Sequence, residues 1–285
     1  MSTYKILIAG CGDVGGTLGN NLAAQGHTVY GLRRNINQLP ASIHGISADL
    51  AQPDTLNSLP EALDILIYAV AAGSREEQRY RQAYPEGLRN LLDALQQQAI
   101  KPKQLFFVSS TAVYQQADHQ WIDETSATEP EGFPGQVMLE AEQIALNSDI
   151  PGCVVRFSGI YGPGRNFMLN QVNEGRGYPQ SPMSYSNRIH RDDCVGVLQH
   201  LINQVDQSPL QPIYLASDCQ PAPLFEVTEW LASQLGVSIT EHSARRAIGS
   251  KRCNNQRLLD SGYQFKYPTY QTGYRSLITA FRKNR

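Results

Sequence analysis

Three glycines near the N-terminus are spaced as in a loop that binds a dinucleotide. They follow an apolar run and fit the pattern G-x-G-x-x-G at Gly10, Gly12 and Gly15. In such a loop the first glycine makes a tight turn, the second lets the backbone approach a pyrophosphate, and the third lets a helix pack closely on a strand. Asp13 and Val14 would start that helix, whose N-terminus favours phosphate charge. The spacing predicts a dinucleotide site, with a plain tight turn as the alternative.

Two arginines at the end of the second strand-like run, Arg33 and Arg34, indicate which dinucleotide binds. An NAD site usually places Asp or Glu here for the ribose 2′-hydroxyl, whereas a guanidinium suits the 2′-phosphate of NADP. We therefore expect NADP, with NAD still open and a solvated basic pair as the alternative. Asp49 closes the third run, where it would accept a hydrogen bond from the adenine amine or cap the following turn.

The first half of the chain alternates between strand-like and helix-like segments. Apolar runs of strand type lie at residues 4–9, 28–33, 43–47, 62–71, 103–110 and 152–157. Helical patterns lie between them at residues 13–25, 76–98 and 135–147. This alternation predicts an α/β fold with a doubly wound parallel sheet, an NAD(P)-binding Rossmann fold. We assign residues 1–160 to this domain.

The second half changes character and predicts a small C-terminal α/β substrate lobe, mostly residues 161–285 and partly interleaved with the sheet. Residues 162–187 are rich in Gly, Pro, Asn and Ser and predict loops around one short helix. We expect further helices at 192–203, 224–235 and 275–282, a strand at 212–216, and an irregular Tyr-rich stretch at 263–274. Four arginines here would either bind a phosphate or carboxylate or lie in solvent: Arg165, Arg176, Arg188 and Arg191.

Composition excludes several classes of protein. Hydrophobic residues make up 41% of the chain, which is ordinary for a globular protein. The net charge is -2, so no basic field exists to hold nucleic acid or an anionic membrane. The longest apolar run, at residues 63–72, is too short to cross a bilayer, and the N-terminus has no signal-peptide pattern. We expect a cytoplasmic protein. Five cysteines without C-x-x-C and six scattered histidines indicate neither disulfides nor a metal site, and we expect all five thiols to be buried.

Five segments resemble motifs of the extended short-chain dehydrogenases/reductases, the family that contains nucleotide-sugar epimerases and dehydratases. LIYAVA at 66–71 resembles the family's fourth strand, GLRNLLDA at 87–94 its GTxNLLEA helix, and VSSTAVY at 108–114 its SSxxVYG strand end. RFSGIYGPG at 156–164 resembles its RxxxVYGPG segment, and RIHRDD at 188–193 its IHVxD segment. The resemblance covers nearly the whole chain. Extended members more often carry GxxGxxG, so the spacing found here implies an atypical subgroup.

This resemblance implies further cofactor contacts and an assembly. Val70 and Ala71 would line the nicotinamide ribose side, and Ser109 would lie at the cofactor end of its strand. The backbone at Gly162 would approach the nicotinamide carboxamide. Extended relatives often dimerise through two helices that correspond to residues 76–98 and 135–147, which implies a homodimer.

The resemblance also shows that catalytic groups are missing. Family chemistry needs a Tyr and, four residues later, a Lys whose charge lowers the phenol pKa. Pro134 and Met138 occupy these positions, and no Y-x-x-x-K occurs in the chain. Ser110 matches the family's Ser, which polarises the substrate oxygen. The available substitutes are three tyrosines and one histidine: Tyr84, Tyr114, Tyr161 and His190.

Each substitute has a structural interpretation beside the catalytic one. Tyr84 aligns with the family's usual Asn and lies on an apolar helix face, so it would pack in the core. Tyr114 and Tyr161 lie in structural motifs. His190 has an imidazole that titrates near neutrality, yet it precedes two aspartates and would equally form a helix N-cap region.

Three functional hypotheses follow. The first is an NADP-preferring oxidoreductase or epimerase/dehydratase-like enzyme, with displaced acid–base groups, acting on a small, nucleotide-sugar-like substrate. The second is a catalytically silent NADP-binding sensor or regulatory protein. The third is a ligand-binding protein that uses no cofactor. All three expect a small-molecule ligand and neither nucleic acid nor a membrane as partner.

Overall fold

The computed structural model describes residues 3–243 and 250–283, which form two compact units. The first unit comprises Met1–Val113, Thr128–Arg156 and Val195–Tyr214. The second comprises Tyr114–Ala127, Phe157–Cys194 and Leu215–Arg285. The assignment of residues 1–160 to the dinucleotide domain stays a prediction.

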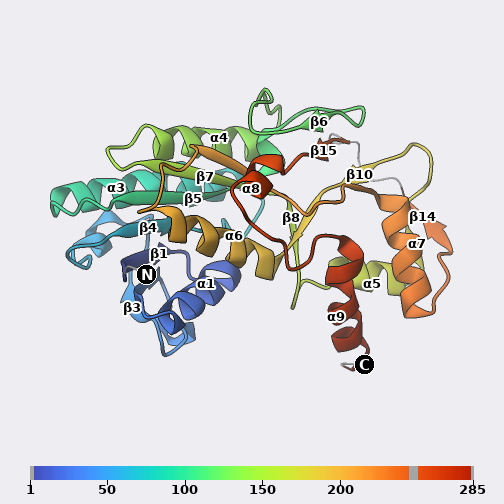
Figure 1. The fold of residues 1–285 in the computed structure, drawn as a ribbon, viewed down its shortest axis with the longest axis horizontal. Helices are drawn as coiled ribbons and strands as arrows, with labels where there is room; N and C mark the ends of the chain where they lie inside the picture. Colours follow the sequence, from blue (N-terminus) through green and yellow to red (C-terminus); the bar gives the residue numbers. More distant parts are fainter. Residues whose placement is uncertain (1–2, 244–249, 284–285) are drawn as a thin grey trace. The chain divides into compact units, whose positions relative to one another are not determined.

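A seven-stranded sheet forms the centre of the first unit (Figure 1). Its order is β12-β7-β5-β4-β1-β2-β3. Strand β1 pairs in parallel with β2 and β4, β2 with β3, and β4 with β5. The strands are β1 Lys5–Ala9, β2 Thr28–Arg33, β3 His44–Ser47, β4 Ile65–Tyr68, β5 Gln104–Ser110, β7 Gly152–Phe157 and β12 Ile213–Ala216. The fold class predicted from the alternating segments is therefore confirmed.

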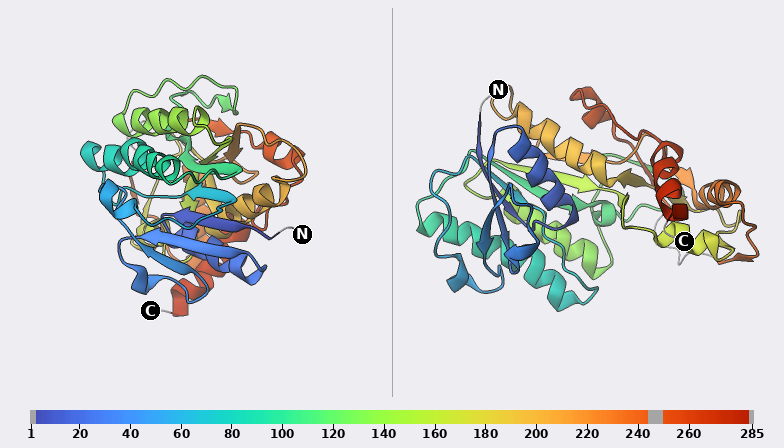
Figure 2. Two further views of the ribbon diagram at one scale, coloured as in Figure 1. Left: turned by 90° about the vertical axis from the view of Figure 1, so that its left-hand side faces the viewer. Right: turned by 90° about the horizontal axis from the view of Figure 1, so that it is seen from below.

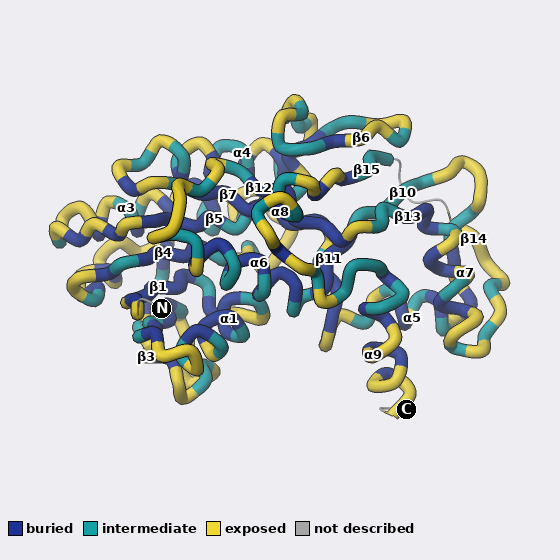
Figure 3. Tube along the Cα trace, in the orientation of Figure 1, coloured by how far each residue is buried: buried dark blue, intermediate teal, exposed yellow. Residues whose placement is uncertain are grey.

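Helices cover both faces of this sheet, as Figure 2 shows, with α3 (Gly87–Gln97) and α4 (Phe133–Leu146) on one face and α1 (Asp13–Ala24) and α6 (Arg191–Gln204) on the other. The strands between them are apolar on both sides, and every residue of β4 is buried (Figure 3). This is the pattern expected of a parallel strand covered on two faces. Short 3-10 turns lie at Ile36–Gln38, Pro53–Leu56 and Thr111–Val113.

The helix predicted at residues 76–98 is interrupted. It forms as α2 (Glu77–Arg81), a π-helical turn at Gln82–Glu86, and α3. Pro85 lies inside the π-helical turn, where it has no backbone N–H to donate. The Gly87 N–H donates to the Gln82 carbonyl, five residues back, and the Ala83 carbonyl accepts a hydrogen bond from the Tyr68 hydroxyl at 2.6 Å. The proline and this tyrosine together explain why the helix departs from regular α geometry.

The second unit contains short two-stranded ladders and four helices among the residues that the structure describes. The pairs are β6 (Trp121–Ile122) with β15 (Arg252–Cys253), β8 (Gly159–Tyr161) with β11 (Arg188–His190), β9 (Arg176–Gly177) with β14 (Glu241–His242), and β10 (Tyr185–Ser186) with β13 (Ala222–Pro223). The helices are α5 Phe167–Asn173, α7 Leu224–Leu235, α8 Gln256–Asp260 and α9 Tyr270–Lys283.

The prediction of an irregular stretch at residues 263–274 is wrong in its last part, because α9 already begins at Tyr270. Tyr270, Tyr274 and Leu277 follow a helical spacing and are buried together in the core formed with α5 and α7. A Cβ atom at Gly273 would overlap the Tyr161 hydroxyl, so this helix position needs a residue without a side chain. Apolar packing on one face therefore draws the tyrosines into the helix.

The cysteine prediction is correct for four thiols and wrong for one. Cys11, Cys153, Cys194 and Cys253 are buried, but Cys219 is exposed. It follows a strand end in a loop that leaves the core. Within residues 3–243 and 250–283, no helix is long and apolar enough to cross a membrane.

A buried ion pair joins the sheet to α4 in the first unit. The Glu142 carboxylate accepts hydrogen bonds from Arg156 Nε at 2.9 Å and from an Arg156 terminal nitrogen at 2.6 Å. It also accepts one from the Ser109 hydroxyl at 2.5 Å. Glu142 is 0% and Arg156 3% exposed, so each charge depends on the other for compensation.

This geometry predicts that Glu142→Gln destabilises the protein by about 3–5 kcal/mol, because it leaves the Arg156 guanidinium buried without a counter-charge. Denaturant unfolding measures the loss. The matched control is Glu140→Gln on the same helix, whose carboxylate pairs with Arg81 and Arg89 at the surface. That change should cost less than about 1 kcal/mol. Equal losses for the two variants would contradict the prediction.

Candidate functional site

The glycine loop connects β1 to α1 at the carboxyl end of β1. Gly10 has φ +93°, and a Cβ atom there would lie 2.5 Å from the Ala69 carbonyl oxygen. A Cβ at Gly15 would lie 2.4 Å from the Gly10 carbonyl oxygen. Around Gly12, by contrast, a Cβ would meet nothing within 4 Å. Two of the glycines are thus required by packing, whereas Gly12 leaves open space beside the loop.

Helix α1 begins directly after this open position. Gly12 is its N-cap residue and supplies no side chain to cap the first turn, which contains Asp13 and Val14. Backbone N–H groups of a first helical turn and the helix dipole favour a bound anion. The loop therefore has the shape and the polarity that a pyrophosphate requires.

The Arg33 guanidinium lies against the same loop. One terminal nitrogen donates to the Cys11 carbonyl oxygen at 3.1 Å, and the other donates to Gln38 Oε1 at 2.5 Å. Arg34, the next residue, is exposed. Burial raises the pKa of the Cys11 thiol to about 12, against the opposing effect of Arg33, so this thiol stays protonated. A fixed positive charge thus borders the glycine loop, as a 2′-phosphate would need.

The other residues of the first unit that are predicted to contact the cofactor include Val70, Ala71 and Asp49, and their surroundings differ. Val70 and Ala71 follow the end of β4, and the Val70 backbone nitrogen lies 2.6 Å from the Cβ position of Gly10. Asp49 caps a turn, because its Oδ1 accepts a hydrogen bond from the Ala51 N–H at 3.0 Å. Its contact with adenine stays a prediction.

Ser109 and Ser110 end β5 and point in different directions. The Ser109 hydroxyl donates inward to Glu142, so this side chain belongs to the buried ion pair. The Ser110 hydroxyl accepts a hydrogen bond from the Ala112 N–H at 3.2 Å and is half-buried. Successive residues of a strand face opposite sides, which explains the difference. Ser110 is therefore the serine that remains available at this strand end.

Tyr84 lies within the π-helical turn and is buried. Burial raises the pKa of its phenol, while a hydrogen bond from the Ala72 backbone N–H opposes that rise. This contact places the hydroxyl beside the segment that follows β4. On α4, Pro134 is in the first turn and Met138 is 5% exposed. Neither proline nor methionine has an ionisable side chain. The catalytic role of Tyr84 stays a prediction.

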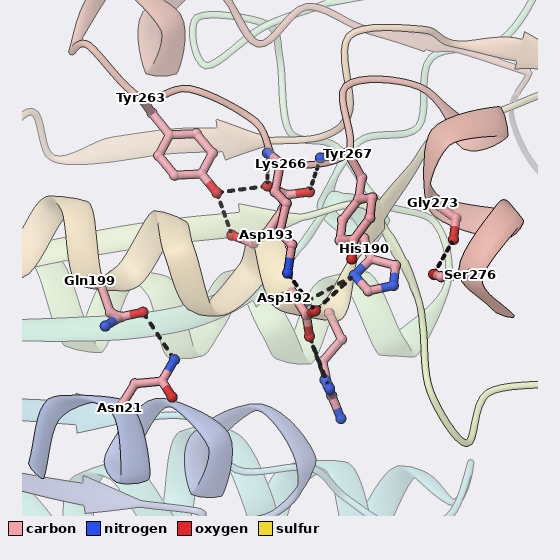
Figure 4. A network of polar contacts seen from close by, with 11 residues as sticks. Asn21, His190, Asp192, Asp193, Gln199, Tyr263, Lys266, Tyr267, Gly273 and Ser276 are labelled. Carbon is pink, nitrogen blue, oxygen red and sulfur yellow. Dashed lines mark hydrogen bonds and ion pairs between the residues drawn. The ribbon is translucent and has the colours of Figure 1, made fainter. Parts of the chain in front are cut away.

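His190, in the second unit, is paired in register with Tyr161 and is 1% exposed. Its Nδ1 accepts a hydrogen bond from the Asp192 N–H at 3.1 Å (Figure 4). Burial, aided by the charges of Arg191 and Lys266 and opposed by Asp192, lowers the imidazole pKa to about 4. The expectation that His190 titrates near neutrality is therefore wrong.

The neutral form of His190 carries its proton on Nε2, because Nδ1 accepts a hydrogen bond. The Nε2 atom is buried and makes no hydrogen bond with any residue that the structure describes. It lies 3.6 Å from the position that a Cβ atom would take at Gly162, whose φ is +149°. Two other predicted substitutes, Tyr114 and Tyr161, are 2% and 5% exposed. Among the predicted residues of this unit, the structure thus brings His190 and Gly162 together.

Asp193 holds the Tyr-rich segment of the second unit in place. Its carboxylate accepts hydrogen bonds from the Tyr263 hydroxyl at 2.8 Å and from the backbone N–H groups of Lys266 at 2.8 Å and Tyr267 at 3.0 Å (Figure 4). These hydrogen bonds attach the segment to the first turn of α6.

Three polar residues of the second unit could not be selected from the sequence as a group. Asp218, Arg188 and Tyr161 are 1%, 5% and 5% exposed and lie in three different segments. Arg188 is therefore not a solvent charge. The sequence patterns single out Tyr161 and Arg188 separately, and no motif includes Asp218.

Comparisons with known proteins place this geometry in a family. Residues 6–176 match the model of the NAD dependent epimerase/dehydratase family. A structure from Methylobacillus flagellatus, described as an NAD-dependent epimerase/dehydratase, is 41% identical with a TM-score of 0.83, covering 99% of this chain and 100% of that one.

Two more distant proteins are similar over most of their length. The UDP-glucuronic acid 4-epimerase of Bacillus cereus, in complex with UDP-glucuronic acid and NAD, is 16% identical with a TM-score of 0.80, covering 99% of this chain and 100% of that one. The 3-diazoavenalumate denitrifying reductase of a Streptomyces species is 23% identical and matches 82% of each chain. With the family model covering more than half of its residues, the chain belongs to the NAD-dependent epimerase/dehydratase family.

Proposed function

We propose that this protein binds NADP(H), in preference to NAD(H), and uses it in an oxidoreductase or epimerase/dehydratase-type reaction. The observation that carries the proposal is the open space at Gly12 next to the start of α1, bordered by the Arg33 guanidinium. Backbone N–H groups of the loop would hold the pyrophosphate, and Arg33 with Arg34 would bind the 2′-phosphate. When bound, the nicotinamide supplies or accepts hydride.

The chain's own residues would then orient the substrate and move its proton. Ser110 would donate a hydrogen bond to the substrate oxygen, which polarises the carbonyl group. Tyr84 keeps its phenol proton at neutral pH, because burial raises its pKa, and would serve as the acid. His190 lies in the second unit and is neutral, so its buried Nε2–H is a hydrogen-bond donor and not a titrating base.

For the substrate we propose a small, nucleotide-sugar-like molecule. The support is the family and the fold shared with an epimerase solved in complex with UDP-glucuronic acid. The reductase of the Streptomyces species, which is 23% identical, supports hydride chemistry. Incubation with NADPH and either UDP-glucose or UDP-glucuronic acid, followed by nicotinamide absorbance and product analysis, tests this choice.

A catalytically silent NADP sensor is the second candidate. It is favoured by α4, where Pro134 and the buried Met138 supply no proton donor. The sensor would bind NADPH without turnover and change its hydrogen-exchange pattern on binding. Turnover of any tested carbonyl compound would exclude it.

The first experiment is a calorimetric titration with NADPH and then with NADH. Tight binding of NADPH with weak binding of NADH is the expected result. Equal affinities would remove the NADP preference and leave the family assignment intact. Binding of neither would overturn the proposed function.

Gly12→Val should lower NADPH affinity by about 100-fold or more, because the side chain would occupy the space that the pyrophosphate needs. The fold should be retained, since a Cβ at Gly12 meets no protein atom within 4 Å. Gly132→Ala is the control, at the exposed N-cap of α4 where a Cβ has only an ordinary contact at 3.5 Å. Calorimetry and thermal unfolding measure both effects. Unchanged NADPH affinity in Gly12→Val would contradict the loop assignment.

Arg33→Ala combined with Arg34→Ala should weaken NADPH about 10- to 100-fold and leave NADH nearly unchanged. The reason is that hydrogen bonds to a charged 2′-phosphate contribute about 1.5–3 kcal/mol. Arg79→Ala, at another exposed arginine, is the control and should change neither affinity. Equal losses for the two cofactors would refute the 2′-phosphate assignment.

A further inference from the structure

A cluster of buried polar groups lies in the second unit, and one of its residues directly precedes Gly162. Tyr161 comes from β8, Arg188 from β11 and Asp218 from the loop after β12. The Tyr161 hydroxyl, one terminal nitrogen of Arg188 and Asp218 Oδ2 are fully buried and make no hydrogen bond within the described part of the chain. We call these three residues the buried cluster.

The backbone brings Arg188 and Asp218 side by side. The Asp218 N–H donates to the Arg188 carbonyl oxygen at 2.7 Å, and the Ser217 hydroxyl donates to the same oxygen at 3.4 Å. The side chains of Arg188 and Asp218 nevertheless form no ion pair within 4.0 Å. Arg188 is directed elsewhere, because its guanidinium lies 5.3 Å from the centre of the Tyr270 ring and donates to the Ser186 hydroxyl. The two opposite charges therefore come from adjacent backbone segments and interact without a direct ion pair.

The groups of the buried cluster also affect one another electrostatically. Burial raises the pKa of Tyr161, with Asp218 raising it further and Arg188 lowering it. Burial raises the pKa of Asp218 to about 7, although Arg188 opposes the rise. Asp218 Oδ1 accepts a hydrogen bond from the Gln220 N–H at 3.2 Å, which leaves Oδ2 to carry the proton.

Below that pKa the buried cluster consists of donors. The guanidinium, the phenol and the protonated carboxyl each have at least one hydrogen without an acceptor among the described residues, and the cluster carries one positive charge. Burying donors and a charge in this way is unfavourable unless a partner completes them. The partner that accepts three hydrogen bonds and neutralises one charge is a small anion.

We propose that Tyr161, Arg188 and Asp218 form an internal binding site for a small monovalent anion, such as a carboxylate or a halide. The anion would accept hydrogen bonds from the Arg188 guanidinium, the Tyr161 hydroxyl and the Asp218 carboxyl. It would lie beneath α9, because Tyr161 packs on two residues of that helix. A Cβ at Gly273 would overlap the Tyr161 hydroxyl, and the centres of the Tyr161 and Tyr274 rings are 4.6 Å apart. The bound anion would thus stabilise the contact between α9 and the β8–β11 ladder.

The proposal makes anion binding depend on pH through Asp218. Other titratable groups that act on Asp218, or on which it acts, come from each packed element: Asp193, Tyr161, Tyr274, Arg188, Cys219 and Cys253. Burial raises the pKa values of the two tyrosines and the two thiols, and also that of Asp193, whose carboxylate accepts three hydrogen bonds. Asp218 is the group of this set whose pKa lies at about 7.

The test is thermal unfolding with sodium formate or sodium chloride, at pH 6 and at pH 8, on either side of the Asp218 pKa of about 7. At a concentration ten times its dissociation constant, the anion should raise the midpoint temperature of unfolding by about 2–4 °C at pH 6. Affinity should fall about tenfold for each pH unit above 7, because deprotonation removes one donor and adds a negative charge. The formate and chloride arms distinguish a carboxylate site from a halide site.

Variants separate the site from a general salt effect. Asp218→Asn keeps a donor without a charge, so the anion response should persist at both pH values. Arg188→Met should lose the response, and Tyr161→Phe should weaken it about tenfold, which covers the case that Arg188→Met fails to fold. Asp54→Asn, an exposed carboxyl in the first unit, is the control and should behave like the unmodified protein.

Two results would overturn the proposal. One is a midpoint at pH 6 that does not respond to either anion, as expected if a water molecule bridges the same atoms. The other is an equal response in Tyr161→Phe and in the unmodified protein. Both are independent of the NADPH titration, so the anion site and the proposed function can fail separately.

Discussion

The first unit depends on the close approach of the glycine loop to the end of β4. The backbone at Gly10 runs so near Ala69 and Val70 that no Cβ fits between them, and Gly15 closes the same contact from α1. This contact lies where β1 is flanked by β2 and β4, which follow it in opposite directions across the sheet. Open α/β sheets bind ligands at such a reversal of strand order. The packing contact therefore lies at the edge of the sheet where the dinucleotide site is predicted.

The two units use polar groups in different ways. In the first, Ser109, Glu142 and Arg156 satisfy one another completely, so the ion pair is a structural connection between sheet and helix. In the second, Tyr161, Arg188 and Asp218 are equally buried, and each has a polar atom without a hydrogen-bond partner among the described residues. Completed networks make a core rigid, whereas an unpaired buried group needs an explanation of its own, such as an ordered water molecule or an ion.

Much of the fold could be predicted because its elements carry local signals. The bounds of β2, β7 and α7 agree with the sequence patterns at 28–33, 152–157 and 224–235. The pattern at 62–71 predicts a strand longer than β4, which spans Ile65–Tyr68. At its carboxyl end, the residues from Ala69 to Ala71 leave the sheet where the glycine loop packs against them. The π-helical turn was missed, since a single proline inside an amphipathic pattern does not reveal the tyrosine that binds the freed carbonyl.

The candidate site was harder to predict where it depends on environment. The glycine pattern is local, and the structure shows what each glycine contacts. The pKa of His190 depends on burial among side chains that are distant in sequence, such as Tyr267 and Lys266, and this cannot be inferred from its neighbours along the chain. The same holds for Asp218, whose burial and charge partners come from other segments.

The three loop glycines differ in how closely the protein packs around them, and this has a consequence for how the sequence can change during evolution. Gly10 and Gly15 are held by packing, so any descendant that keeps the fold must keep them. Gly12 has no such constraint, because a Cβ atom there meets nothing within 4 Å among the described residues. Only a bound ligand would select for glycine at this position. A related chain that has lost its dinucleotide would therefore retain the first and third glycines while the middle one diverges, which makes that residue a record of whether binding has been under selection.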